Sequence, residues 1–225
     1  MGEAARAVLP GGCELTAVAV ARGPRSIESA VDAAVAGAAL VDLVRRLPAH
    51  DAYLIACFGD PALDAVRELT RAPVVGIGEA AFQAAATIAR RFAIVTTLAR
   101  GIPAIEDALD RHGARARCVG IVPLRIPVSE QGAEHGDTTE AIVAAGAGLV
   151  LEHGAEALVL ACGGMAGVAR TVQERVGVPV CDGVSFGALL AYSLWRCGLQ
   201  TGKTGSYAFP EPIPYDEMPS PSGHG

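Results

Sequence analysis

An internal repeat constrains the fold of this chain more than any other feature. DAYLIACFGD (residues 51–60) has the same pattern as EALVLACGGM (residues 156–165): an acidic residue, an alternating apolar run, Ala-Cys and a turn of small residues. Each cysteine is followed by a helical stretch and then by a Pro-Val pair, at Pro73 and at Pro179, after almost the same interval. The repeat therefore predicts one βαβ unit used twice, and two similar lobes that face each other.

Short apolar runs alternate with helical stretches along the whole chain, which is typical of an α/β fold with mostly parallel sheets. We expect two pseudo-symmetric three-layer lobes, with the active site in the cleft between them. The expected strands are Leu15–Ala21, Ala52–Cys57, Pro73–Ile77, Phe92–Thr97, Arg115–Ile121, Ala157–Cys162 and Pro179–Cys181.

Helices are expected between these strands. Asp60 followed by Pro61 has the pattern of an N-cap and a first helical position, and predicts a helix toward Thr70. The other expected helices are Ile27–Arg46, Gly101–His112, a helix from Asp137 onward, Gly164–Val176 and Val184–Cys197.

The order of these elements predicts the division into lobes. We expect a first lobe over residues 1–97, completed by about residues 198–215, and a second lobe over residues 98–197. Because prolines gather near the C-terminus, we expect residues 216–225 to form a flexible tail.

Charge and hydropathy exclude several classes of partner. The formal net charge is −6, so a nucleic acid or an anionic membrane surface is not an expected partner. No apolar run reaches the roughly 18 residues of a membrane span, and the N-terminus has no secretory signal pattern. We therefore expect a cytoplasmic protein. A pyridoxal-phosphate mechanism would have to use Lys203, the only lysine.

The cysteines do not have the spacing of a metal site. They contain no C-x-x-C pair, and the histidines are scattered, so we expect no structural zinc. Disulfides are rare in a reducing compartment. The six cysteines are Cys13, Cys57, Cys118, Cys162, Cys181 and Cys197.

Two of these cysteines stand out, because Cys57 and Cys162 both end a repeated strand at the mouth of a following helix. Ligands of parallel sheets bind beyond the carboxyl ends of the strands, and a helix N-terminus lowers a thiol pKa and attracts anions. Gly59, Gly163 and Gly164 would let backbone N–H groups approach a ligand oxygen.

Two such thiols on opposing lobes are able to flank one carbon, where one removes a proton and the other returns a proton to the opposite face. This is racemisation by two bases without a cofactor, and it needs sulfurs roughly 7 Å apart. The alternative for each of these two cysteines is the role of a small buried hydrophobe. For the four cysteines outside the repeat we expect a role in packing or at the surface.

A glycine pattern raises a second possibility. Gly76, Gly78 and Ala81 match the G-x-G-x-x-A fingerprint of dinucleotide-binding proteins. However, Thr96 and Thr97 stand where the acid that binds the ribose should end the next strand. We therefore expect no dinucleotide cofactor, and interpret the glycines as positions of close helix–strand packing.

Seven segments occur along the chain in a characteristic order: GPRSIES, ACFGDPALDAVREL, PVVGIGEAA, RFAIVTTL, LACGGM, VPVCDGV and TGKTGSYAFP. Through them, the chain resembles the hydantoin racemase branch of the aspartate/glutamate racemase superfamily from about Gly23 to Pro210. The resemblance implies a two-lobed α/β fold, inversion without cofactor at a carbon next to a carbonyl, catalytic roles for Cys57 and Cys162, and a homo-oligomer.

The resemblance also implies a binding set for the substrate. Backbone amides near Phe58 and at Gly163–Gly164, together with Thr96 and Thr97, would hold the carbonyl and the nitrogens of the ring. Apart from the resemblance, the positions of Met165 and Phe58 beside the two thiols predict apolar walls, and Ser26 would line the pocket or cap a helix. The full set is Phe58, Gly59, Thr96, Thr97, Gly163, Gly164, Met165 and Ser26.

The N-terminus departs from the family pattern. Family members usually begin with a strand that ends in an Asn-Pro-Asn-Thr/Ser turn, whereas MGEAARAVL resembles the helix after that strand. We therefore expect the first lobe to lack this strand.

These patterns predict a cofactor-independent racemase that acts on a 5-monosubstituted hydantoin or on allantoin, a small-molecule substrate. Other chemistries of the same superfamily stay open: an amino-acid racemase, a maleate isomerase or an arylmalonate decarboxylase, the last of which needs one thiol. A non-catalytic ligand-binding protein and a dithiol redox protein are the alternatives outside it.

Overall fold

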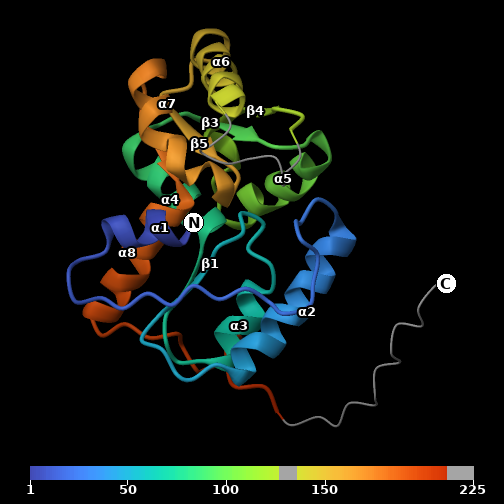
Figure 1. Cartoon of the computed structure of the whole chain (residues 1–225), viewed down its shortest axis with the longest axis vertical. Coiled ribbons are helices and arrows are strands. Elements are labelled where there is room, and N and C mark those ends of the chain that lie inside the picture. Colours follow the sequence, from blue (N-terminus) through green and yellow to red (C-terminus); the bar gives the residue numbers. More distant parts are fainter. Residues whose placement is uncertain (127–135, 212–225) are drawn as a thin grey trace, which may run out of the picture.

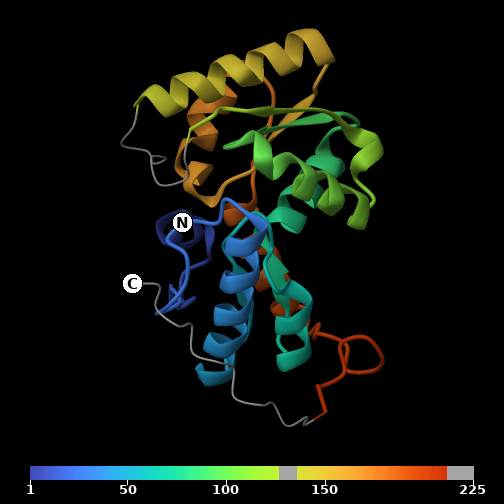
Figure 2. The same cartoon turned by 90° about the vertical axis from the view of Figure 1, so that its right-hand side faces the viewer.

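The computed structural model describes residues 1–126 and 136–211, and these residues form two α/β lobes (Figure 1, Figure 2). The expected α/β class and its two lobes are confirmed. The tail predicted at residues 216–225 lies outside the described residues.

The second lobe is built on a parallel four-stranded sheet in the order β4-β3-β5-β6. Alternate residues of its central strands face two different cores: Phe92 and Ile94 belong to one cluster, and Ala93 and Val95 to the other. This alternation places helices on both faces and makes three layers. The strands are β3 (Phe92–Thr96), β4 (Cys118–Pro123), β5 (Ala157–Leu160) and β6 (Val180–Asp182).

Each face of this sheet has its own pair of helices. Helices α6 (Gly136–His153) and α7 (Ala169–Val176) pack on one face and against each other. Helices α4 (Ile77–Ile88) and α5 (Ile102–Arg111) pack on the other. Short 3-10 segments, Ala99–Gly101, Arg115–Arg117 and Gly163–Val168, connect the elements.

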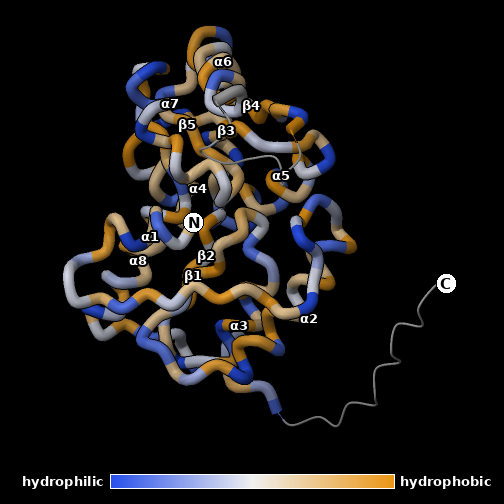
Figure 3. Tube along the Cα trace, viewed as in Figure 1, coloured by the Kyte–Doolittle hydropathy of each residue, from blue (hydrophilic) through white to orange (hydrophobic). Residues whose placement is uncertain are grey.

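The first lobe has a smaller sheet, in which β1 (Tyr53–Ile55) pairs in parallel with β2 (Val74–Gly76). Its tube is mainly hydrophobic (Figure 3). Helices α2 (Ala30–Arg46) and α3 (Leu63–Leu69) share one apolar cluster with this sheet. Helices α8 (Gly183–Arg196) and α1 (Gly2–Val8) pack against each other in the same lobe, and α8 contacts both strands.

The expected strand Leu15–Ala21 is wrong, because this segment is irregular and joins no sheet. In the second lobe, β3 lies between β4 and β5 and pairs with both. Among the described residues, no strand occupies the corresponding position beside β1. Leu15–Ala21 therefore has no row of backbone N–H and C=O groups to pair with.

The boundary between the lobes also differs from the one expected at residue 97, because the two sheets divide the chain elsewhere. Strand β3 belongs to the sheet of the second lobe, while α8 packs on β1 and β2 of the first. The chain therefore crosses between the lobes at α4 and again where β6 leads into α8. Beyond α8, the Thr201 amide donates to the Arg71 carbonyl at 2.9 Å, which ties the following segment to the first lobe.

The start of α3 differs from the expected cap. Asp60 does not cap this helix, because α3 begins at Leu63 with Ala62 in the cap position. Both Asp60 (φ 45°) and Ala62 (φ 54°) have left-handed backbone conformations, in which non-glycine residues are uncommon. The turn after Cys57 is therefore tight and strained, and it directs the Asp60 side chain away from α3.

Two glycines of α6 provide a matched test of packing. A methyl group at Gly148 would meet no atom within 4 Å, whereas one at Gly146 would lie 2.6 Å from Cδ1 of the fully buried Leu158. We expect Gly148→Ala to raise the free energy of unfolding by about 0.5–1 kcal/mol, because alanine favours the helix. Gly146→Ala should lower it by about 1 kcal/mol through overpacking. Urea denaturation of both variants measures the difference; equal effects would contradict it.

Candidate active site

Cys57 lies just beyond β1 and Cys162 just beyond β5, so the two cysteines come from different lobes. Their turns meet: a Cβ atom at Gly163 would lie 3.3 Å from the carbonyl oxygen of Ala56. A negative charge on Cys162 also disfavours one on Cys57. The structure therefore brings the two repeated thiols together at the junction of the lobes.

Both thiols are half-buried and free of disulfides. The sequence predicts that a helix N-terminus and its free amides lower the pKa of each thiol, but the net shift of both thiols is in the opposite direction. Burial, the largest effect, raises the pKa of Cys57 and of Cys162 above the ordinary cysteine value. Backbone N–H groups oppose this effect, but removal of each thiolate from water outweighs them.

The hydrogen bonds to the two sulfurs differ. The Gly59 backbone lowers the pKa of Cys57, while the charges of Asp60 and Cys162 raise it. The backbones of Gly164 and Met165 both lower the pKa of Cys162, and no acidic neighbour among the described residues opposes them. The surroundings of the two thiols therefore differ in charge, since an acid lies near Cys57 and, among the described residues, none affects Cys162.

The expected ligand-binding glycines lie around these thiols. A methyl group at Gly59 would meet no atom within 4 Å, so one side of the Cys57 turn is open. Gly163 and Gly164 begin the 3-10 segment that follows Cys162. These positions are compatible with backbone donors that point at a ligand.

The expected apolar walls are mostly core residues instead. Phe58 is 8% exposed and packs edge-to-face on Phe82, with ring centroids 5.4 Å apart. Met165 is 1% exposed and belongs to the core under α6 and α7. Both side chains are held in place by packing, which leaves little of their surface for a ligand.

Thr96 and Thr97 lie at the carboxyl end of β3, the strand beside β5. Both are buried, and their carbonyl oxygens accept hydrogen bonds from Leu124 and Arg125 at 2.8 Å. They therefore share the sheet edge at which Cys162 lies. Ser26 lies in the loop before α2, where its hydroxyl donates to the Glu28 carboxylate at 3.1 Å.

Asp60 has a role that the sequence pattern did not predict. Its carboxylate accepts hydrogen bonds from the amides of Gly78 (2.9 Å) and Glu79 (2.8 Å), in the first turn of α4. Burial raises the pKa of Asp60 to about 7 against the effect of these donors. The signal in the sequence was an acid three residues after Cys57 together with a Gly-x-Gly start of the later helix.

Gly76 and Gly78 are positions of close packing, but against the turn after Cys57 and not, as expected, between a helix and a strand. A methyl group on Gly76 would overlap the Asp60 carboxyl group, and one on Gly78 would overlap the carbonyl oxygen of Phe58. The turn after Cys57 thus rests directly on the start of α4. Glu79 caps the same helix, and its carboxylate also pairs with Arg67 at 2.5 Å.

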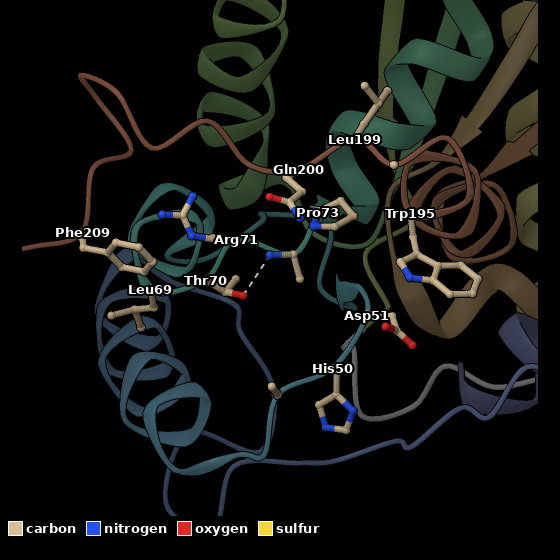
Figure 4. Close-up of a pocket in the computed structure, with 13 residues that line it drawn as sticks. His50, Asp51, Leu69, Thr70, Arg71, Pro73, Trp195, Leu199, Gln200 and Phe209 are labelled. Atoms are coloured by element: carbon tan, nitrogen blue, oxygen red, sulfur yellow. Dashed lines mark hydrogen bonds between the residues drawn. The ribbon is translucent and has the colours of Figure 1, made fainter.

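A separate depression of about 520 Å³ lies at the end of the first lobe that is opposite to Cys57 (Figure 4). His50, Asp51, Arg71, Trp195 and Phe209 line it, near the amino ends of β1 and β2. Ligands of parallel sheets bind at the opposite, carboxyl ends. We therefore assign the candidate active site to the two thiols.

The described residues give two further observations on binding. In residues 1–126 and 136–211, no three His, Cys, Asp or Glu side chains are placed to hold a metal ion together. Within the same ranges, no helix combines the length and the hydropathy needed to cross a membrane.

Comparison with known proteins gives consistent matches. Residues 1–191 match the family described as Asp/Glu/hydantoin racemase. The hydantoin racemase of Rhizobium meliloti is 40% identical over 194 residues, which are 83% of this chain and 78% of that protein. The hydantoin racemase of Paenarthrobacter aurescens is 38% identical over 213 residues, which are 93% of this chain and 90% of that protein.

A solved structure agrees with these relatives. The allantoin racemase from Klebsiella pneumoniae superposes with a TM-score of 0.93 at 38% identity, and the match covers 96% of this chain and 89% of that one.

Proposed function

This chain belongs to the Asp/Glu/hydantoin racemase family, and from that premise we propose that it inverts the 5-carbon of a 5-monosubstituted hydantoin or of allantoin. The observation that carries the proposal is the meeting of the Cys57 and Cys162 turns at the junction of the lobes. Relatives named hydantoin racemase and a neighbour named allantoin racemase support this substrate class.

The chemistry suits a pair of thiols. The hydrogen on the 5-carbon lies next to a ring carbonyl, so its removal leaves an enolate rather than a localised carbanion. A well-placed backbone N–H at the developing oxyanion lowers the barrier by about 3–4 kcal/mol. The glycine amides after each cysteine are the proposed donors.

The proton balance needs no cofactor. One cysteine, as thiolate, removes the proton from one face of the ring and becomes a thiol. The other cysteine, as thiol, gives its proton to the opposite face and becomes a thiolate. The enzyme returns to its first state by proton exchange with water or by turnover in the reverse direction.

Polarimetry tests the proposal directly. The purified chain is incubated with each enantiomer of 5-benzylhydantoin and of allantoin, and the spontaneous rate is subtracted. We expect the rotation to fall to zero from both enantiomers of at least one compound. A chain that is inactive on both compounds but racemises a free amino acid would overturn the proposed substrate class.

The pH dependence of racemisation follows from the buried thiols. Burial raises the pKa of both Cys57 and Cys162, so the thiolate needed as base forms only at alkaline pH. We expect kcat/KM to rise with pH through neutrality and to keep rising near about pH 9, the range of an unperturbed thiol. Initial rates measured by polarimetry in steps from pH 6 upward, with blanks, give this profile. A plateau already present at about pH 7 would contradict it.

We propose further that the enzyme is a cytoplasmic homo-oligomer. Val31 and Val35 of α2 support self-association, because they are 71% and 51% exposed on one face of the helix. Light scattering after size-exclusion chromatography gives the mass of the assembly.

A further inference from the structure

Asp60 ties the first thiol to another helix. Its amide donates to the Cys57 carbonyl at 2.9 Å and closes the turn that carries the thiol. Its carboxylate, on a residue only 8% exposed, accepts the amides of Gly78 and Glu79 at the start of α4. One buried carboxylate therefore fixes the Cys57 turn on α4, which begins at Ile77.

The second repeat has no acid at the position that corresponds to Asp60. Met165 takes the place of Asp60 in the second turn, and its side chain is buried in an apolar cluster. The helix that corresponds to α4 in the second repeat is α8. It is capped by its own Asp182, which accepts the Ser185 amide at 2.8 Å. Asp182 corresponds in the repeat to Gly76. Helix α4 therefore has two acids at its start, its own Glu79 and Asp60 from the thiol turn, whereas α8 is capped by Asp182 alone among the acids of the described residues.

The two thiols therefore differ in their electrostatic surroundings, because an acid lies near Cys57 and an uncharged residue takes its place near Cys162. Cys57 has one backbone donor, Gly59, and an acid three residues away whose charge opposes its thiolate. The backbones of Gly164 and Met165 lower the pKa of Cys162, although the Met165 amide also donates to the Cys162 carbonyl at 3.0 Å. The residue that corresponds to Asp60 is the uncharged Met165. A negative charge is therefore better stabilised on Cys162 than on Cys57.

The charge on Asp60 itself depends on its surroundings. Burial raises its pKa, the charge of Glu79 on α4 raises it further, and Arg67 on α3 lowers it. Arg67 forms an ion pair with Glu79, so these two neighbours act in opposite directions on the pKa of Asp60. With a pKa of about 7, Asp60 becomes charged in the pH range in which thiolates begin to form.

We propose that Asp60 is a positioning residue that seats the Cys57 turn on α4 and keeps the resting proton on Cys57, so that Cys162 is the base of the resting enzyme. The inference rests on the proposed racemase function, because the position of this proton decides which thiol acts first. The proposal says which cysteine acts first, whereas the internal repeat alone does not distinguish the two.

Site-resolved alkylation tests this order without any turnover. The full chain is treated briefly with iodoacetamide across a pH series, and the peptides that contain Cys57 and Cys162 are quantified by mass spectrometry. The pH at half-maximal rate reports the ionisation of each thiol and does not depend on its accessibility. We expect the midpoint of Cys162 to lie below that of Cys57. The reverse order, or equal midpoints, would overturn the proposal.

The variant Asp60→Asn removes the charge and keeps the size of the side chain, but its amide nitrogen replaces one of the two oxygens that accept hydrogen bonds from Gly78 and Glu79. We expect the Cys57 midpoint to move down by about one pH unit, with the Cys162 midpoint unchanged. Asp182→Asn is the matched control, because it removes a capping carboxylate that has no effect on either thiol; neither midpoint should move. A Cys57 midpoint that stays in place in folded Asp60→Asn overturns the role of the charge.

The wild-type order needs no variant, so the proposal stays testable even if Asp60→Asn fails to fold. Failure of the proposed function gives a different result, since a chain without racemase activity still yields both midpoints.

Discussion

Replacing either Cys57 or Cys162 with serine is expected to lower kcat for racemisation by about 10³-fold or more. A serine hydroxyl is far too weak an acid to supply an alkoxide near neutral pH, so the altered position has neither base nor acid. The structure gives the reason for expecting the loss in both variants. The two thiols come from different lobes, so neither is able to take the position of the other.

Hydrogen exchange should separate the two halves of the reaction. In D₂O, the variant that keeps one thiolate is still able to remove the proton of one enantiomer and return deuterium to the same face. We expect Cys57→Ser and Cys162→Ser to exchange opposite enantiomers without inversion, measured by proton NMR of the 5-hydrogen. The double variant should racemise no more slowly than either single one, because the pair acts as a unit.

Cys197→Ser is the control for these variants, since Cys197 is exposed at the end of α8. It should keep wild-type racemisation. A single-cysteine variant with substantial racemisation would show that one thiol is enough and would contradict two-base inversion. Loss of turnover in only one of the two variants is the result expected of one-thiol chemistry such as that of a decarboxylase.

The repeat made the central geometry predictable. Two similar strands that end in cysteine, each followed by a helix and a second parallel strand, are sufficient to place Cys57 and Cys162 at equivalent sheet edges. The cores follow the same logic, because alternation of apolar residues in β3 predicts a face for each layer. Local pattern and global fold agree in these elements.

Other features depend on contacts that a local pattern does not contain. Asp60-Pro61 has the form of a helix start, yet the partners of Asp60 are amides of α4, which a local capping rule does not consider. Leu15–Ala21 has the composition of a strand, but a strand also needs a neighbour. The thiol pKa values follow burial, which the position at a helix start does not reveal.

Gly78→Ala is expected to have the largest effect on stability among the glycines around the Cys57 turn. The new methyl group would overlap the Phe58 carbonyl oxygen and lie 2.9 Å from Oδ2 of Asp60. A backbone carbonyl has no rotamer with which to avoid the clash, so the turn or the start of α4 must shift. We expect the free energy of unfolding to fall by about 3 kcal/mol.

The same shift of the turn should also lower the rate of racemisation. Phe58 follows Cys57 directly, so a displaced carbonyl moves the thiol relative to Cys162. Misplacement of a reacting group by about 1 Å costs roughly 100-fold in rate, and we expect a loss of this size in kcat for Gly78→Ala. Urea denaturation and polarimetry on the same preparation measure the two effects together.

Gly59→Ala is the matched control for stability, because its methyl group would meet no atom within 4 Å although it lies in the same turn. Its free energy of unfolding should stay within about 0.5 kcal/mol of the wild-type value. If Gly78→Ala is as stable as Gly59→Ala, the Cys57 turn does not rest on α4. The hydrogen bonds of Asp60 to Gly78 and Glu79 would then lose their role in holding the first thiol against the second.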